Sequence, residues 1–300
     1  MSASYPRIRY DSVHEAGRSL LIRECVSLTF YLHRPHRDIT QEVRRALEVY
    51  LQAVEPGALG LYVDEDGDGR DLDEHGWAVI QQRFQDPLGA RVELMGATDE
   101  RAGFEFVYEG QSVEHAQRGW VSRVTFYLPT EYLEAEGPGR VRRLVLELAE
   151  GLPFTSGQAG LSFLFPEALL GVTKPLHEDA FRYPGLDMPD SYIAMDIGHR
   201  VKGAYWLTFL GPRLLEDLGG VEGLRARLPS PGTTVQSMDG GRAVVSLGEG
   251  PEAGDIAEGR TLPAYRELAR VLEPRLYTFP GCWDGFSRED MRRWERRFLD

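Results

Sequence analysis

The apolar run from residue 203 to residue 210, with the sequence GAYWLTFL, limits the fold of this chain more than any other segment. A short apolar run bounded by turn residues is typical of a buried strand. Gly211-Pro212 then breaks the strand, and the leucines before Gly219-Gly220 predict a short helix that these glycines close. No side chain of a typical catalytic kind lies in this run. The run therefore favours a protein that acts through a binding surface over one that catalyses a reaction.

Strand and helix patterns alternate along the rest of the chain. Strands are predicted over residues 25–32, 59–63, 91–95, 103–108, 121–128, 159–165, 233–236 and 243–247. Helices are predicted over residues 38–54 with Asp38 as the N-cap, 77–84, 141–148, 167–179, 262–272 and after Ser287. The turn Asp239-Gly240-Gly241 predicts a hairpin, and in the loop over residues 183–190 Gly185 is expected to permit a turn.

This order predicts an α+β fold, with mostly antiparallel sheet flanked by helices. Phe104, Phe106 and Tyr108 alternate with Glu105, Val107 and Glu109, which indicates one buried face. The first 165 residues suggest two related α+β halves, although no repeat is found at the level of residues. We expect one domain over residues 1–300, with 1–155 and 156–300 as candidate lobes.

The net charge is −13, from 47 acidic and 34 basic residues. Such a chain repels phosphates, so it is not expected to bind nucleic acid through general electrostatics. It should instead attract a basic partner and associate with it quickly at low salt. Solubility alone would explain the same charge equally well.

Cys25 and Cys282 are the only cysteines, too few for a disulfide framework and without metal-ligand spacing, so both are expected to be buried free thiols. The N-terminus has no signal-peptide pattern, and no run of about 18 apolar residues would span a membrane. We therefore expect a cytoplasmic protein without a cofactor. The oligomeric state is not predicted.

An acidic loop over residues 64–74 is the sharpest local motif. It carries seven carboxylates, on Asp64, Glu65, Asp66, Asp68, Asp71, Asp73 and Glu74. Its start matches an EF-hand loop, but His75 stands where the bidentate glutamate should be, so calcium binding is poorly supported. The loop is either a solvated turn or a surface for a basic partner. We take these seven residues as candidate partner-binding residues.

Trp283 is added to this candidate surface because it lies in the glycine-bounded segment 281–285, where an aromatic residue can be an exposed anchor. Packing of the last helix onto the body would explain this tryptophan equally well.

Catalytic motifs are missing from the chain. It has no H-E-x-x-H, no G-x-S-x-G, no P-loop and no G-x-G-x-x-G opening a helix. No catalytic residue is therefore assigned, and we expect a binding protein that is not an enzyme. One alternative is a hydrolase that uses carboxylates in an unrecognised pocket, which would require converging carboxylates with perturbed pKa values. Another is a scaffold protein that only dimerises.

Several short segments together resemble one family, the TsiV-like immunity proteins of type VI secretion. They are residues 162–166 (SFLFP), 183–187 (YPGLD), 202–210 (KGAYWLTFL), 218–220 (LGG), 251–255 (PEAGD) and the helix end at 265–274. The resemblance covers most of the chain and is densest over residues 155–275. It implies an antitoxin role: members are encoded beside secreted antibacterial effectors, in known cases nucleases, and cover the effector's active site. It carries over no catalytic residues and does not identify the toxin.

Overall fold

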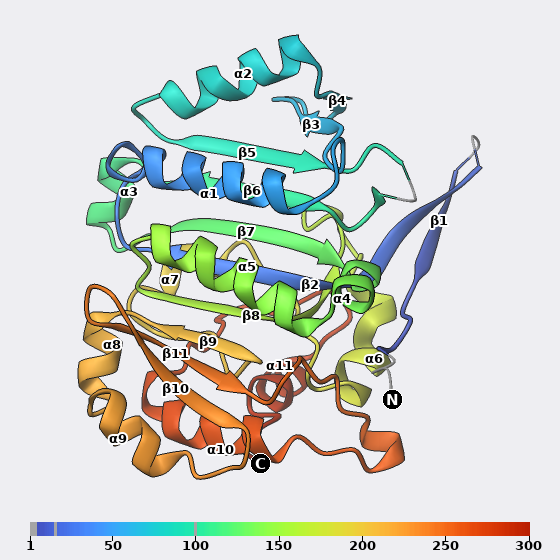
Figure 1. Ribbon diagram of the computed structural model, residues 1–300. Coiled ribbons are helices and arrows are strands. Elements are labelled where there is room, and N and C mark those ends of the chain that lie inside the picture. Colours follow the sequence, from blue (N-terminus) through green and yellow to red (C-terminus); the bar gives the residue numbers. More distant parts are fainter. Residues whose placement is uncertain (1–4, 15–16, 99–100) are drawn as a thin grey trace.

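A single large antiparallel sheet organises the chain in the computed structural model, which describes residues 5–14, 17–98 and 101–300 (Figure 1). Ten strands follow one another in the order β10-β11-β9-β8-β2-β7-β6-β5-β3-β4, and β1 pairs with β2. Their bounds are β1 Tyr10–His14, β2 Gly17–Leu32, β3 Leu61–Val63, β4 Gly69–Asp71, β5 Ala90–Met95, β6 Glu105–Gly110, β7 Ser122–Pro129, β8 Ser156–Leu164, β9 Leu207–Leu210, β10 Thr233–Met238 and β11 Arg242–Leu247. The α+β, mostly antiparallel fold predicted from the sequence is confirmed.

Helices α1 (Thr40–Ala53) and α5 (Pro138–Gly151) lie side by side in front of the central strands (Figure 1). Each places apolar residues at helical spacing against the sheet, for example Val43, Leu47 and Tyr50 in α1. The Tyr50 ring lies 5.2 Å from that of Phe126 in β7, within the main core. Shorter or peripheral helices complete this set: α2 Glu74–Gln85, α3 Val113–Gln117, α4 Thr130–Glu136, α8 Pro212–Asp217 and α9 Gly220–Arg227.

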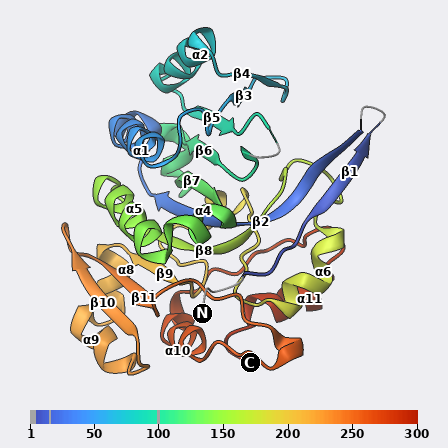
Figure 2. The ribbon, with the colours of Figure 1, turned by 45° about the vertical axis from the view of Figure 1, so that its right-hand side comes forward.

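The other face of the sheet is covered over only part of its width. The part of the chain after β8 supplies its helices: α6 His177–Arg182, α7 Ile193–Asp196, α10 Pro263–Leu272 and α11 Arg288–Glu295. They lie mainly beside the later strands, whereas β5 and β6 lie at the other end of the sheet (Figures 1 and 2). This face carries a groove that residues of β5, β6 and β7 line.

Several predicted boundaries were wrong. The helix over 167–179 is absent: this segment forms turns until a 3₁₀ turn at Lys174–Leu176 leads into α6. Gly171, with φ of 80°, and Pro175 interrupt any helix there. Asp38 lies in a 3₁₀ turn (His36–Asp38), and α1 begins at Thr40 with Ile39 at its N-cap.

Of the other predictions, some were confirmed in full, one in part, and one was wrong. Only Leu207–Leu210 of the apolar run joins the sheet, although Ala204, Tyr205 and Trp206 are buried as well. The hairpin at residues 239–241 and the helix over 77–84 are confirmed. Cys25 is buried but Cys282 is exposed, because it lies in a surface loop. No helix in the described ranges is both long and apolar enough to cross a membrane.

A charged cluster fastens the N-terminal segment to the body. Arg7 and Arg9 both reach Glu24, whose side chain is 2% exposed, and both also pair with Glu131 at the start of α4. Partial burial would raise the pKa of Glu131, but its own backbone N–H, Arg23 and Arg9 outweigh burial and lower it to about 2.

Acid should therefore loosen this cluster. A carboxyl with a folded-state pKa of about 2 contributes stability above its unfolded pKa of about 4.3 and loses that contribution as the pH falls towards 2. Because Glu131 is 46% exposed, we expect at most about 1 kcal/mol. In urea unfolding between pH 6 and pH 2, Glu131→Gln should show a shallower loss of stability than the wild type. Equal slopes would contradict this assignment.

Candidate functional site: a charged groove on the uncovered sheet face

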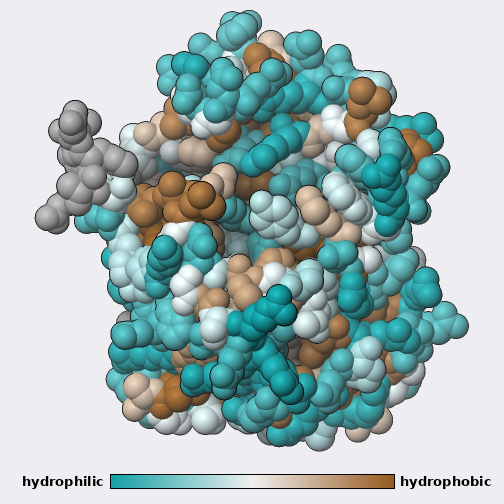
Figure 3. Space-filling view, turned by 180° about the vertical axis from the view of Figure 1, so that it is seen from behind, coloured by the Kyte–Doolittle hydropathy of each residue, from teal (hydrophilic) through white to brown (hydrophobic). Residues whose placement is uncertain are grey.

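The groove over β5, β6 and β7 has a volume of about 930 Å³. The view from behind shows this face hollowed, with hydrophobic residues beside the hollow (Figure 3). Besides these strands, the groove is lined by β2 around Arg23, by the neighbouring segment that leaves β8, residues 164–168, and by residues around α7. Val63 and Gly67, from β3 and the loop that follows it, line it as well.

Alternate residues of three paired strands form the floor. Register places Arg91 opposite Glu109 and Glu109 opposite Arg123, so charges of opposite sign meet across β5, β6 and β7. In the next row Glu93 is opposite Val107, and in the third Met95 is opposite Glu105, which in turn is opposite Tyr127. The intervening residues of the same strands point to the core under α1, which is why the polar set gathers on one face.

Arg123 is the buried cation of this floor. Its side chain is 4% exposed, and its guanidinium lies 3.0 Å from Glu109 and 3.4 Å from Glu167. One oxygen of Glu167, Oε2, is nevertheless buried without a hydrogen-bond partner among the described residues. The other arginines have their own partners: Arg91 lies 3.6 Å from Glu93, and Arg23 pairs with Glu131.

Glu105 differs from the other three carboxylates of the groove. In the described part of the chain, its side chain has no ion pair and no hydrogen bond. Burial, and then the charges of Glu93 and Glu167, raise the pKa of Glu105 to about 8. Burial also raises the pKa of Glu93, by more than the neighbouring charge of Arg91 lowers it. The groove thus holds an unpaired carboxyl that is largely protonated at neutral pH.

The rim of the groove is apolar. Leu88 is 76% exposed, Tyr192 64% and Met195 38%, and all three side chains line the groove. Few large hydrophobic residues are this exposed in the described chain. An apolar rim around polar groups is typical of a surface that another molecule covers.

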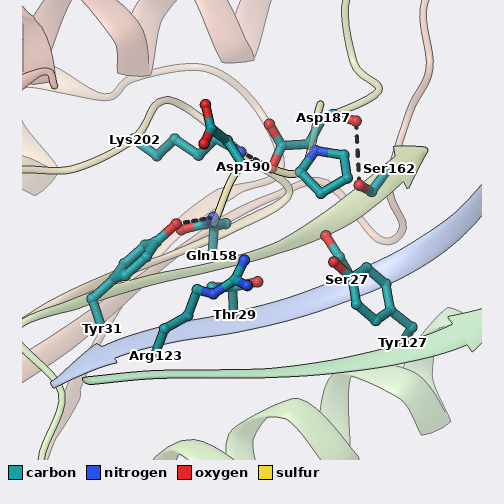
Figure 4. A pocket seen from close by; sticks show the side chains of 11 residues that line it. Ser27, Thr29, Tyr31, Arg123, Tyr127, Gln158, Ser162, Asp187, Asp190 and Lys202 are labelled. Carbon is teal, nitrogen blue, oxygen red and sulfur yellow. Dashed lines mark hydrogen bonds and ion pairs between the residues drawn. The ribbon is translucent and has the colours of Figure 1, made fainter. Parts of the chain in front are cut away.

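A separate small cavity lies beneath the loop over residues 187–190 (Figure 4). It is lined by polar residues of β2, β7 and β8, and its volume is about 10 Å³, enough for about one water molecule. Lys202 Nζ lies 2.8 Å from Asp187 Oδ2, and the Tyr205 hydroxyl donates to Asp187 Oδ1 at 2.8 Å. The cavity is too small for a substrate, so these residues form a structural network.

The acidic loop lies at the edge of the groove, because Gly67 belongs to both. Asp64 Oδ1 accepts hydrogen bonds from the backbone N–H groups of Asp66 and Asp68, and Arg70 pairs with Asp64 and Asp68. Asp73 caps α2 by accepting from Gly76 N–H at 2.9 Å. Glu65, Asp66, Asp71 and Glu74 are exposed. Among the described residues no group of three or more acidic, histidine or cysteine side chains could hold a metal ion.

Trp283 is only partly exposed. Its indole N–H donates to Asp190 Oδ2 at 3.2 Å, and its ring packs edge-on against Trp294 at 4.8 Å. These contacts hold α11 to the body. Its role in partner binding stays a prediction, as do those of the acidic-loop residues.

The sequence alone does not reveal the groove. The alternation in residues 104–109 places Glu105 and Glu109 on one face, but this pattern indicates only that the face is turned away from the core. No local pattern connects this face with Glu93 on a neighbouring strand or with Glu167, which follows β8. Only the register of β5, β6 and β7 brings these side chains together.

The fold and the groove define a class of protein: an α+β scaffold built on one broad antiparallel sheet, with a partly uncovered face that carries a groove lined by charged residues. The family model described as "Type VI immunity for VRR-NUC" matches residues 42–298, and the chain belongs to this family. Among solved structures, the Pseudomonas aeruginosa T6SS protein PA0821 is similar, with a TM-score of 0.80 and 21% identity over 97% of this chain and 87% of that one. No curated protein matches at a significant level.

Membership of this family confirms the resemblance seen in the sequence and shows the chain to be a type VI immunity protein. It also decides against the hydrolase alternative. The groove does contain what that alternative requires, namely neighbouring carboxyls with raised pKa values. The family, however, is one of immunity proteins and not of hydrolases.

Proposed function

We propose that this chain neutralises a VRR-NUC nuclease by binding its phosphate-recognising surface and covering its active site. The observation that carries the proposal is the uncovered groove with an apolar rim, bordered by the acidic loop, whose exposed carboxylates supply the negative charge. A nuclease must present positive charge to its substrate, so an acidic surface is complementary to it. The encounter would take place in the cytoplasm, where the DNA of the producing cell needs protection.

Nuclease inhibition tests this proposal directly. The purified chain is titrated into a VRR-NUC toxin from the same strain, and cleavage of a plasmid is followed. We expect cleavage to stop near one equivalent, and we expect duplex DNA to compete with the chain for a catalytically inactive toxin. A complex that cleaves DNA at the full rate, or that binds DNA as well as the free toxin does, would overturn the proposal.

The acidic loop is proposed to accelerate this association. Asp64 should be left unchanged in a variant of this loop, because its side chain accepts hydrogen bonds from backbone N–H groups that hold the loop in shape. The triple variant Glu65→Gln, Asp66→Asn, Asp68→Asn should associate about tenfold more slowly at low salt with little change in the dissociation rate, because long-range attraction acts on the encounter. Stopped-flow measurements at several salt concentrations would show the difference shrinking as salt screens it.

A variant with the same loss of charge at the other end of the sheet is the control. Glu216→Gln, Glu222→Gln and Glu249→Gln change exposed residues near α8, α9 and β11. If the control slows association as much as the loop variant does, net charge is responsible, and the loop has no special role.

A further inference from the structure

We infer that the groove is the docking site for a projecting segment of the nuclease, and that Glu105 receives the ammonium or guanidinium group of a lysine or arginine in that segment. This inference rests on the proposed function and names the chemistry of the contact. The groove is open to another molecule, and its volume of about 930 Å³ exceeds what one side chain requires. It therefore fits a cationic side chain together with its neighbours.

Pairing within the groove selects Glu105 as the receptor. Glu109 and Glu167 already share Arg123, and Glu93 has Arg91. Glu105 alone among these four has no ion pair or side-chain hydrogen bond within the described chain. A half-buried carboxyl of this kind gains more from an incoming cation than a carboxylate that is already paired.

Glu167 provides a second, independent sign of an incomplete site. Its Oε2 atom is buried and accepts no hydrogen bond in the described structure, although the side chain lines the groove. Buried polar atoms of folded proteins nearly always have partners. A donor supplied by the partner would satisfy Glu105 directly, and Glu167 would reach the same donor by turning Oε2 out of its buried position.

The apolar rim of the groove indicates which kind of residue flanks the cation in the nuclease. Tyr192 and Met195 lie on one side of the groove and Leu88 lies towards β5, and all three are exposed in the free protein. They would cover apolar residues that flank the inserted lysine or arginine, and would exclude water from the charge pair. A buried charge pair surrounded by apolar contacts is the usual composition of an energetic centre in a protein interface.

Docking of a cation on Glu105 should release a proton. In the free protein the pKa of Glu105 is raised to about 8, whereas a nearby cation favours the charged form. The complex then has the lower pKa, so affinity rises with pH up to about 8 and levels off above it. The charged and titratable groups that act on Glu105 are Glu93 from β5, Arg23 and Cys25 from β2, Tyr127 from β7, Tyr50 from α1, and Glu167.

Calorimetry with catalytically inactive VRR-NUC toxin tests the inference. At pH 7, titrations in buffers of different ionisation enthalpy should show release of close to one proton by the wild type. Glu105→Gln should show none, and its Kd should be at least about 30-fold weaker, in the range found when one partner of a desolvated charge pair is removed. Glutamine has the shape of the protonated acid, so the free variant should unfold at the temperature of the wild type. Glu222→Gln, an exposed change elsewhere, should match the wild type.

A second pair of variants keeps the test independent of the charge. Tyr192→Ala should weaken binding about tenfold, as truncation of an aromatic anchor in an interface does. Ile256→Ala removes a comparably exposed apolar side chain outside the groove and should have no effect. If Glu105→Gln and Tyr192→Ala both bind as the wild type does, the groove is not the docking site, although the proposed function stands. If the wild type does not bind the toxin, the proposed function and the inference fail together.

Discussion

Lys202→Met should lower the free energy of unfolding by about 3–5 kcal/mol, because it leaves the buried Asp187 carboxylate without its cation. The two side chains are 8% and 4% exposed, and Lys202 Nζ donates both to Asp187 Oδ2 at 2.8 Å and to the Met188 carbonyl at 2.6 Å. The Asp187 backbone also bonds with Leu161 and Phe163 in β8. Loss of the lysine should therefore loosen the loop from the sheet, as measured by urea unfolding.

Variants of Asp187, which pairs with Lys202, and of Tyr205, which bonds to Asp187, separate the effect of the unpaired charge on stability from the effect of lost packing. Lys202→Met combined with Asp187→Asn removes both charges and should be more stable than Lys202→Met alone, because no uncompensated charge stays buried. Tyr205→Phe, which removes only a hydroxyl that bonds to Asp187, should cost about 1–2 kcal/mol. A single variant Lys202→Met as stable as the wild type would show that water reaches Asp187 and that the pair is not structural.

Gly185→Ala should destabilise the protein by about 3 kcal/mol or more. The sequence suggests that this glycine serves a turn, but its φ is not positive. The structure gives a different reason: a Cβ here would lie 2.0 Å from the carbonyl oxygen of Glu252, and Gly185 N–H donates to the Ala253 carbonyl at 2.9 Å. Because the clash is with backbone atoms, no side chain can move aside. Thermal or urea unfolding measures the effect.

Gly160→Ala is the matched control. Gly160 lies in β8 and is equally buried, but the nearest atom to a Cβ built there is 3.7 Å away, an ordinary van der Waals distance. This variant should stay within about 1 kcal/mol of the wild type. If both alanines are tolerated equally, the close approach of residues 185 and 252 is not what requires a glycine.

Local patterns predicted most elements of the fold. The alternation around Phe106 and the spacing of Val43, Leu47 and Tyr50 reflect burial on one side, which repeats every second residue in a strand and every three to four in a helix. These patterns failed to predict element boundaries that depend on single residues and not on periodic burial. The segment 167–179 is apolar enough for a helix, but Gly171 and Pro175 divide it into turns. Thr40 begins α1 although Asp38 is the better capping residue.

The candidate site also has one part that the sequence predicts and one part that it does not. The acidic loop is contiguous, so its charge is visible along the chain, and the structure adds that Asp64 and Asp73 hold backbone N–H groups. The groove is assembled from β5, β6, β7 and the segment after β8. Glu93, Glu105 and Glu167 are far apart along the chain, and no spacing rule relates them.

The amino-acid sequence by itself determined the α+β class, the acidic character and the family, because periodic burial, total charge and short motifs are properties of consecutive residues. Only the tertiary structure decided where the uncovered face lies and which carboxyl stays unpaired there. The reason is physical: an ion pair depends on distances of a few ångströms across strands, and register between β5, β6 and β7 sets these distances.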